Sequence, residues 1–180
     1  MTRLLVLASF FVLASPALSC EPVADRSLET SAVLERIQKT KDPVTANNLS
    51  SELWAIWTDA PDSEAQALLD RGMEQRRTYD FAGAVETLDK LVEYCPDYAE
   101  GWNQRAFAKF LQLNYDEALE DLDRALEINP QHVAAMSGKA LTLMGMGRPE
   151  LAQSVLRDAL ELNPWLPERR YLVEKPGQDI

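Results

Sequence analysis

Apolar residues along this chain recur with the spacing of one helix face, and the pattern itself repeats. Segments 80–96, 114–130 and 148–164 read DFAGAVETLDKLVEYCP, NYDEALEDLDRALEINP and RPELAQSVLRDALELNP. Their aligned apolar positions lie on one face of a helix. The proline that ends each segment cannot continue a helix. The sequence therefore predicts three copies of a helical unit of 34 residues, at 65–98, 99–132 and 133–166.

Small residues at two positions of each unit indicate that the unit is a helical hairpin. Two antiparallel helices cross closely only where their side chains are small, and turn residues such as Asp80, Asn114 and Gly147 separate the two helices. The small residues at positions 8 and 20 of the three units are Gly72, Ala106, Ala140, Ala84, Ala118 and Ala152.

A single hairpin of this kind cannot bury its own apolar face, so neighbouring hairpins have to stack. We therefore expect an all-α fold, a right-handed solenoid of helical hairpins with a concave groove. Residues 31–64 form a weaker copy, with Trp54 and Trp57 at positions that are small or aliphatic elsewhere, and they predict a degenerate N-terminal capping hairpin. Residues 167–180 predict a short C-terminal capping helix followed by a tail.

The first residues have the features of an export signal. Arg3 precedes an apolar run from Leu4 to Ala14, which is too short to span a bilayer because a spanning helix needs about 20 residues. Cleavage after Ser19 would leave Cys20 at the start of the mature chain. We thus expect a signal peptide at 1–19, a flexible linker at 20–30 and a location in the periplasm.

Cys20 permits two interpretations. As the first mature residue it is a candidate lipidation site, although the three residues before it depart from the usual lipoprotein signal. Alternatively, Cys20 pairs with Cys95, the only other cysteine, in an oxidising compartment. Spacing alone does not decide between them.

The repeat pattern strongly resembles the tetratricopeptide repeat, and Trp102 occupies that motif's position-4 tryptophan. From residue 46 to residue 172 the chain also resembles small exported tetratricopeptide-repeat proteins of Gram-negative bacteria, through SSELWAIW, YAEGWNQRA and the repeat spacing. The resemblance implies an adaptor that binds a partner protein or peptide.

By this resemblance, the first helix of each unit lines the groove, and we expect a partner segment to be anchored and oriented there. Phe107, Phe110 and Met144 would anchor it, and Asn103 and Arg77 would orient it. The groove residues that we expect to contact the partner are Met73, Arg76, Arg77, Asn103, Phe107, Phe110, Leu141 and Met144.

One partner class of the family is not expected here. Co-chaperones of this family grip a C-terminal carboxylate with lysine, asparagine and arginine at five repeat positions. This chain instead has Leu69, Met73, Gln104, Ala134 and Gly138 at those positions.

A row of cations at position 7 of each unit is less usual. Arg71, Arg105 and Lys139 would stack, with Asp89 and Asp123 as partners on the neighbouring helices. We interpret them as a ladder of ion pairs between helices; the alternative is a binding site for an anionic ligand.

Composition and the missing chemistry narrow the function further. The formal net charge of −11 argues against nucleic acid as a partner, and membrane contact is expected only through a lipid anchor. His132, the only histidine, has no metal-ligand pattern around it and is expected to be a solvated turn residue. We expect no metal, no cofactor and no catalysis, and nothing fixes the oligomeric state. The alternative function is a Cys20-anchored lipoprotein that assembles an envelope complex through its acidic outer face.

Overall fold

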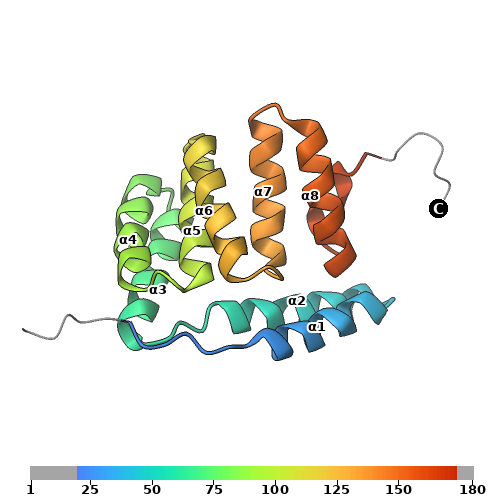
Figure 1. The fold of residues 1–180 in the computed structure, drawn as a ribbon, viewed down its shortest axis with the longest axis horizontal. Helices are drawn as coiled ribbons and strands as arrows, with labels where there is room; N and C mark the ends of the chain where they lie inside the picture. The colour runs from blue at the N-terminus through green and yellow to red at the C-terminus, as the bar shows by residue number, and fades with distance from the viewer. Residues whose placement is uncertain (1–19, 174–180) are drawn as a thin grey trace, which may run out of the picture.

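The structure is a computed structural model, and it describes residues 20–173. In that range the chain forms eight α-helices and one 3-10 helix, without a strand (Figure 1). The predicted signal peptide at 1–19 and the tail from 174 lie outside the described residues. The helices are α1 (Ser27–Lys39), α2 (Pro43–Trp57), α3 (Ser63–Arg77), α4 (Phe81–Tyr94), α5 (Ala99–Leu111), α6 (Tyr115–Ile128), α7 (Val133–Gly145) and α8 (Pro149–Leu162), followed by the 3-10 helix η1 (Pro167–Tyr171).

Helices α3 to α8 form three stacked hairpins, which confirms the predicted all-α repeat fold (Figure 1). Small residues lie where the helices cross, as the sequence predicts. A Cβ atom added to Gly72 would lie 2.6 Å from the side chain of Leu88, so the first hairpin has no room for a larger residue there. Ala106 and Ala140 are fully buried at the equivalent positions of the other two hairpins.

The first helix of each repeat ends in the same way. The residue after the C-cap has a left-handed backbone, at φ 66° for Tyr79, 65° for Leu113 and 70° for Gly147. In the last repeat the Gly147 and Arg148 amides donate to carbonyls near the helix end, which is a Schellman motif. Only glycine adopts this backbone conformation without strain, so the first two repeats carry a local cost that the third does not.

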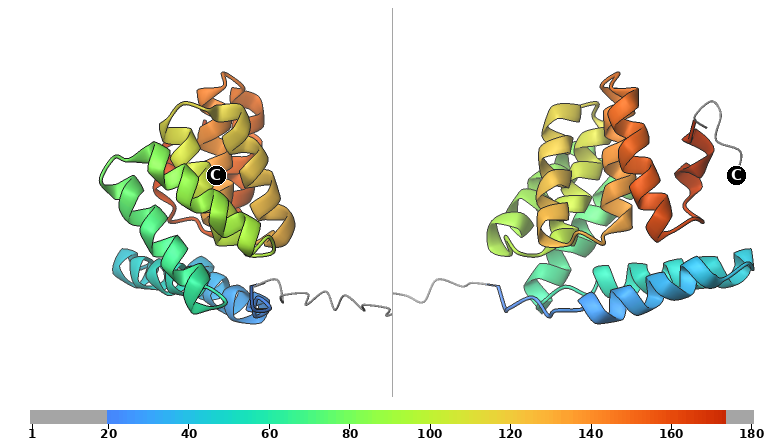
Figure 2. Two further views of the ribbon diagram at one scale, coloured as in Figure 1. Left: turned by 90° about the vertical axis from the view of Figure 1, so that its left-hand side faces the viewer. Right: turned by 45° about the vertical axis from the view of Figure 1, so that its right-hand side comes forward.

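The N-terminal hairpin α1–α2 lies across the ends of the stacked repeats rather than stacking on the first one (Figures 1 and 2). The apolar face of the hairpin packs against the start of α7 and the segment after α8. This cluster comprises Val33, Leu34, Ile37, Leu49, Leu53, Ile56, Trp57 and Val133, with Ala134, Met136, Leu162, Trp165 and Leu166 at its edge.

The packing of the hairpin differs from the expectation of a cap on the first repeat, and the tryptophans explain why. Close stacking of helices requires small residues, whereas the Trp57 side chain is large. It packs at the junction of the second and third repeats. There its indole stacks on the imidazole of His132, with 4.2 Å between ring centroids.

A disulfide joins Cys20 to Cys95, with 5.1 Å between the Cα atoms. This bond attaches the start of the described chain to the end of α4. The Glu21 amide also donates to the Asp62 carboxylate, and α1 already begins at Ser27. The segment 20–30, expected as a flexible linker, is therefore attached at one end and helical at the other. A disulfide-bonded Cys20 has no free thiol for a lipid, so the structure does not support the lipid anchor.

Among residues 20–173, no helix is both long enough and apolar enough to cross a membrane.

Candidate functional site

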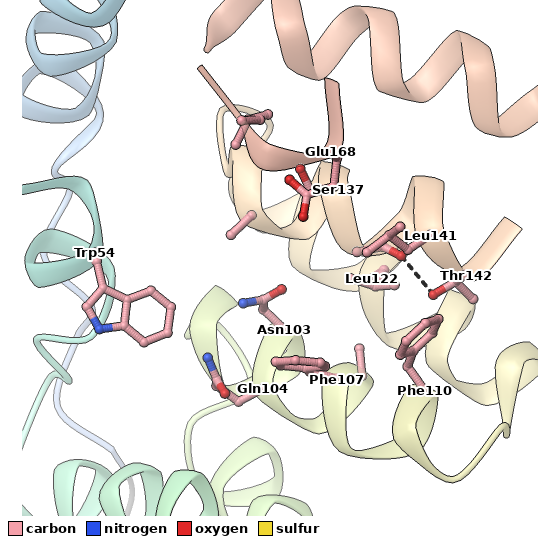
Figure 3. Close-up of a pocket in the computed structure, with 14 residues that line it drawn as sticks. Trp54, Asn103, Gln104, Phe107, Phe110, Leu122, Ser137, Leu141, Thr142 and Glu168 are labelled. Carbon is pink, nitrogen blue, oxygen red and sulfur yellow. Dashed lines mark hydrogen bonds between the residues drawn. The ribbon is translucent and has the colours of Figure 1, made fainter. Parts of the chain in front are cut away.

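A pocket of about 240 Å³ opens on the face formed by the first helices of the second and third repeats (Figure 3). Helices α5 and α7 supply most of its walls. Trp54 of α2 faces it from the N-terminal hairpin, and Leu166 and Glu168 complete it from the C-terminal segment. The pocket is thus built from three parts of the chain that are far apart in sequence.

Four of the predicted groove residues meet in this pocket: Asn103, Phe107, Phe110 and Leu141. The side chain of Phe107 is 42% exposed, which is unusual for a phenylalanine and places its ring at the pocket mouth. Phe110 packs against Tyr115 at 5.5 Å between ring centroids, so the repeat itself holds this ring in place.

The other four predicted groove residues do not line the pocket. Met73 is half-buried against the core of the first repeat, and Met144 is half-buried at the end of α7. Arg77 is exposed and donates to Glu74 on its own helix, at 2.7 and 2.6 Å. Arg76 is half-buried, and its guanidinium lies over the Phe107 ring, 4.2 Å from the ring centroid.

A buried carboxylate beside the pocket organises its polar side. Glu100 is 1% exposed, and its oxygens accept from Asn103 at 3.0 Å and from Gln104 at 2.5 Å. His132 lies 2.8 Å from the same carboxylate and is 0% exposed. A buried charge is tolerated only when it is well hydrogen-bonded, and these three contacts supply that.

The prediction that His132 is a solvated turn residue is wrong. Its Nδ1 accepts the Ala135 amide at 3.3 Å and so caps the start of α7. In a neutral imidazole the proton then lies on Nε2, which donates to Glu100. The sequence signal for this role is weak: a histidine directly before a predicted helix, at the position of an N-cap.

Two side chains that line the pocket carry polar atoms without a hydrogen-bond partner. Gln104 Oε1 and Ser137 Oγ are buried and unpaired, and the residues are 1% and 6% exposed. Leaving such groups unpaired typically costs about 1–3 kcal/mol each. The pocket wall therefore includes polar side chains as well as apolar ones, although these two atoms are themselves covered. Trp54 and Gln104 also line the pocket, although neither occupies a repeat position that predicts a groove residue.

The cation row at position 7 forms ion pairs in two of the three repeats. Arg105 binds Asp89 at 2.7 Å and Asp121 at 2.6 Å, and Lys139 binds Asp123 at 2.5 Å. Within residues 20–173, Arg71 makes no such pair. These contacts between helices support the structural interpretation for Arg105 and Lys139, with Asp121 as an unforeseen partner.

One group of metal-ligand side chains occurs in the described part of the chain. The sulfur atoms of Cys20 and Cys95 and a carboxylate oxygen of Asp62 lie within 4.8 Å of one another. The sulfur atoms are joined in the disulfide, and thiolates rather than disulfides bind metals. Asp62 also caps α3 by accepting the Ala65 amide, and this hydrogen bond is the main cause of its lowered pKa.

The fold and the pocket define a helical-repeat protein with a small pocket on the face formed by its first helices. Family models described as tetratricopeptide repeat match residues 99–132 and 133–164, the second and third predicted units. These two units of the chain therefore match the tetratricopeptide repeat.

Two relatives found by sequence similarity are named for the same repeat. A TPR repeat-containing protein of Rhizobium etli is 29% identical over 135 residues, which are 73% of this chain and 65% of that protein. A tetratricopeptide repeat protein 36 homolog of Nematostella vectensis is 35% identical over 65 residues, 36% of each chain. The chain thus spans less than two thirds of these relatives.

Solved structures share the fold. The first TPR of Spaghetti (RPAP3), bound to an HSP90 peptide, superposes with a TM-score of 0.58 at 21% identity. It covers 60% of this chain and 86% of that one. The type III secretion translocator chaperone SycD of Yersinia enterocolitica gives 0.56 at 17% identity, covering 61% and 84%. At these identities the likeness shows the fold alone.

Proposed function

We propose that this protein is a non-catalytic interaction module that binds a segment of a partner protein in the pocket between α5 and α7. The observation that carries the proposal is the pocket itself, whose walls combine the exposed Phe107 ring with polar side chains such as Asn103 and Ser137. Pockets for small molecules usually measure about 300–1,000 Å³, so a space of about 240 Å³ suits one or two side chains of a peptide better than a cofactor.

Solved neighbours support a peptide as the ligand class. Several are TPR domains in complex with HSP90 or HSP70 peptides. The residues expected to grip such a chaperone carboxylate are replaced here by Leu69, Met73, Gln104, Ala134 and Gly138. We therefore propose that this chain binds a peptide, but not that it binds the C-terminal peptides of these chaperones.

We also propose that the protein is exported into an oxidising compartment such as the periplasm. The signal-like pattern of residues 1–19 and the disulfide between Cys20 and Cys95 support this, since disulfides persist mainly outside the cytosol. The test is N-terminal sequencing of the protein from fractionated source cells, together with thiol titration. A mature chain that begins at Cys20 and has no free thiol is expected, and an uncleaved chain with two free thiols would contradict export.

The binding function is tested by photo-crosslinking from the pocket. Three proteins are compared, and each has a benzophenone amino acid in place of Phe107. The first has no other change, the second also has Leu141→Gln in the pocket wall, and the third also has Leu151→Gln at an exposed site outside the pocket. We expect protein adducts that Leu141→Gln reduces and Leu151→Gln leaves unchanged. Equal yields from all three proteins, with folding intact by circular dichroism, would refute binding in the pocket.

A further inference from the structure

Arg76 is a cation at the pocket edge that lacks a counter-charge of its own. It is half-buried, and its Nε atom is buried without a hydrogen-bond partner. Among residues 20–173 no carboxylate lies within 4.0 Å of its guanidinium nitrogens. Burial lowers the pKa of Arg76, and the negative charge of Glu100 opposes that shift. The guanidinium is thus held in a partly desolvated position that would be stabilised by an anion.

Glu100 does not serve as that anion. Its two oxygens already accept from Asn103, Gln104 and His132 at 2.5 to 3.0 Å. Two other arginines of the described chain, by contrast, are paired with carboxylates. Arg105 binds two aspartates, and the neighbouring Arg77 binds Glu74 through two nitrogens.

Phe107 links Arg76 to the pocket. The ring lines the pocket, and the guanidinium lies over the same ring at 4.2 Å from its centroid. A ligand group bound in the pocket and an anion bound to Arg76 would therefore be close neighbours, within the reach of adjacent residues of one peptide. The contact with the ring restricts the motion of the guanidinium, and an arginine held in place favours a carboxylate, which it can bind with two parallel hydrogen bonds.

We propose that the ligand is a polypeptide segment that places an apolar side chain in the pocket and a neighbouring carboxylate side chain on Arg76. This rests on the proposed function and specifies the chemistry of the partner. Because the protein carries a formal net charge of −11, long-range repulsion disfavours an acidic tract, so we expect a single acidic residue beside the apolar one.

The test is selection from a random dodecapeptide library displayed on phage, with full-length mature protein as bait. The baits are the wild type, Arg76→Met, Arg77→Met and Phe107→Ala. Arg77→Met is the matched control, since it removes the same charge one residue away from an arginine already paired with Glu74. Arg76→Gln is a second variant for use if Arg76→Met alters the circular dichroism spectrum.

We expect the wild type and Arg77→Met to select peptides with an aspartate or glutamate next to an apolar residue. Arg76→Met should keep the apolar preference and lose the acidic one. For a selected peptide, removing one partner of this charge-assisted contact should weaken binding about tenfold. Changing its acidic residue to the amide should have the same effect on the wild type and none on Arg76→Met.

The outcomes separate the two proposals. Phe107-dependent peptides without an acidic residue, or equal losses in Arg76→Met and Arg77→Met, would overturn the inference about the carboxylate and leave the binding function standing. If no selected peptide depends on Phe107, both the inference and the proposed function fail.

Discussion

Replacing Glu100 with methionine should be among the most damaging single changes to this fold. The side chain is 1% exposed and accepts from three donors, of which Gln104 and His132 are themselves almost fully buried. Methionine has a similar length and offers no comparable acceptor, so at least two buried donors lose their partner. At about 1–3 kcal/mol for each donor left unpaired, we expect a loss of about 4 kcal/mol.

The assay is urea denaturation of the disulfide-bonded protein, followed by far-ultraviolet circular dichroism and tryptophan fluorescence. Glu100→Gln should fall between the wild type and Glu100→Met, because an amide keeps one acceptor and loses the charge. Glu120→Gln, at an exposed position of α6, should change the free energy of unfolding by less than about 0.5 kcal/mol.

A double-mutant cycle with His132→Phe tests the reasoning directly. Phenylalanine can keep the stack on Trp57, and it removes the donor that Glu100 satisfies. The double variant should therefore lose less free energy of unfolding than the two single variants lose together, by at least about 1 kcal/mol. A loss below about 1 kcal/mol for Glu100→Met, or strict additivity in the cycle, would show that this hydrogen-bond network does not stabilise the fold as its geometry indicates.

Three further predictions concern other parts of the fold. Cys95→Ser should lower the free energy of unfolding by up to about 4.5 kcal/mol, from the chain-entropy relation for a crosslink over 75 residues, and a urea midpoint that does not respond to a reducing agent would contradict it. Leu113→Gly should stabilise the protein by about 0.5–1 kcal/mol, because it relieves a left-handed backbone, whereas Gly147→Leu should destabilise it by a similar amount; thermal denaturation of both variants checks the opposite signs. Hydrogen bonds, of which the bond from the Ala65 amide has the largest effect, lower the pKa of Asp62 below 3.8. The ionised Asp62 side chain therefore stabilises the fold above pH 3.8, and this contribution is lost as the pH falls below 3.8. The urea midpoint of Asp62→Asn should therefore fall less steeply than that of the wild type on acidification.

The repeat fold could be predicted from the sequence because its rules are local. The prolines at 96, 130 and 164 each follow the end of a helix that they cannot continue. Small residues such as Ala106 and Ala140 permit the two helices of a hairpin to cross closely. The placement of the N-terminal hairpin follows no such rule. It depends on contacts between residues far apart in sequence, for example Ser31 with Gln131 at 2.9 Å and the Gln38 side chain with the Glu161 carbonyl at 2.9 Å.

The pocket was predictable only in part, for a related reason. Repeat positions indicate which helix face lines the groove, and three residues chosen from them, Asn103, Phe107 and Phe110, line the same pocket. They do not tell which of two adjacent arginines faces the groove. Consecutive residues on a helix point about 100° apart, so a small rotation of the helix about its axis determines which of the two faces inward. The structure assigns Glu74 to Arg77 and the Phe107 ring to Arg76.

The N-terminal hairpin connects the stability of the fold to the shape of the pocket. Trp54, which faces the pocket, and Trp57 are three residues apart on α2 and therefore lie on neighbouring positions of one helix face. Trp57 is held by the His132 stack and by the Tyr98 hydroxyl, which donates to its carbonyl at 2.7 Å. The same His132 depends on Glu100 for its hydrogen bond. A change that loosens the Glu100 network therefore also frees the helix that positions Trp54, so such variants should bind the partner more weakly even though no residue lining the pocket has been altered.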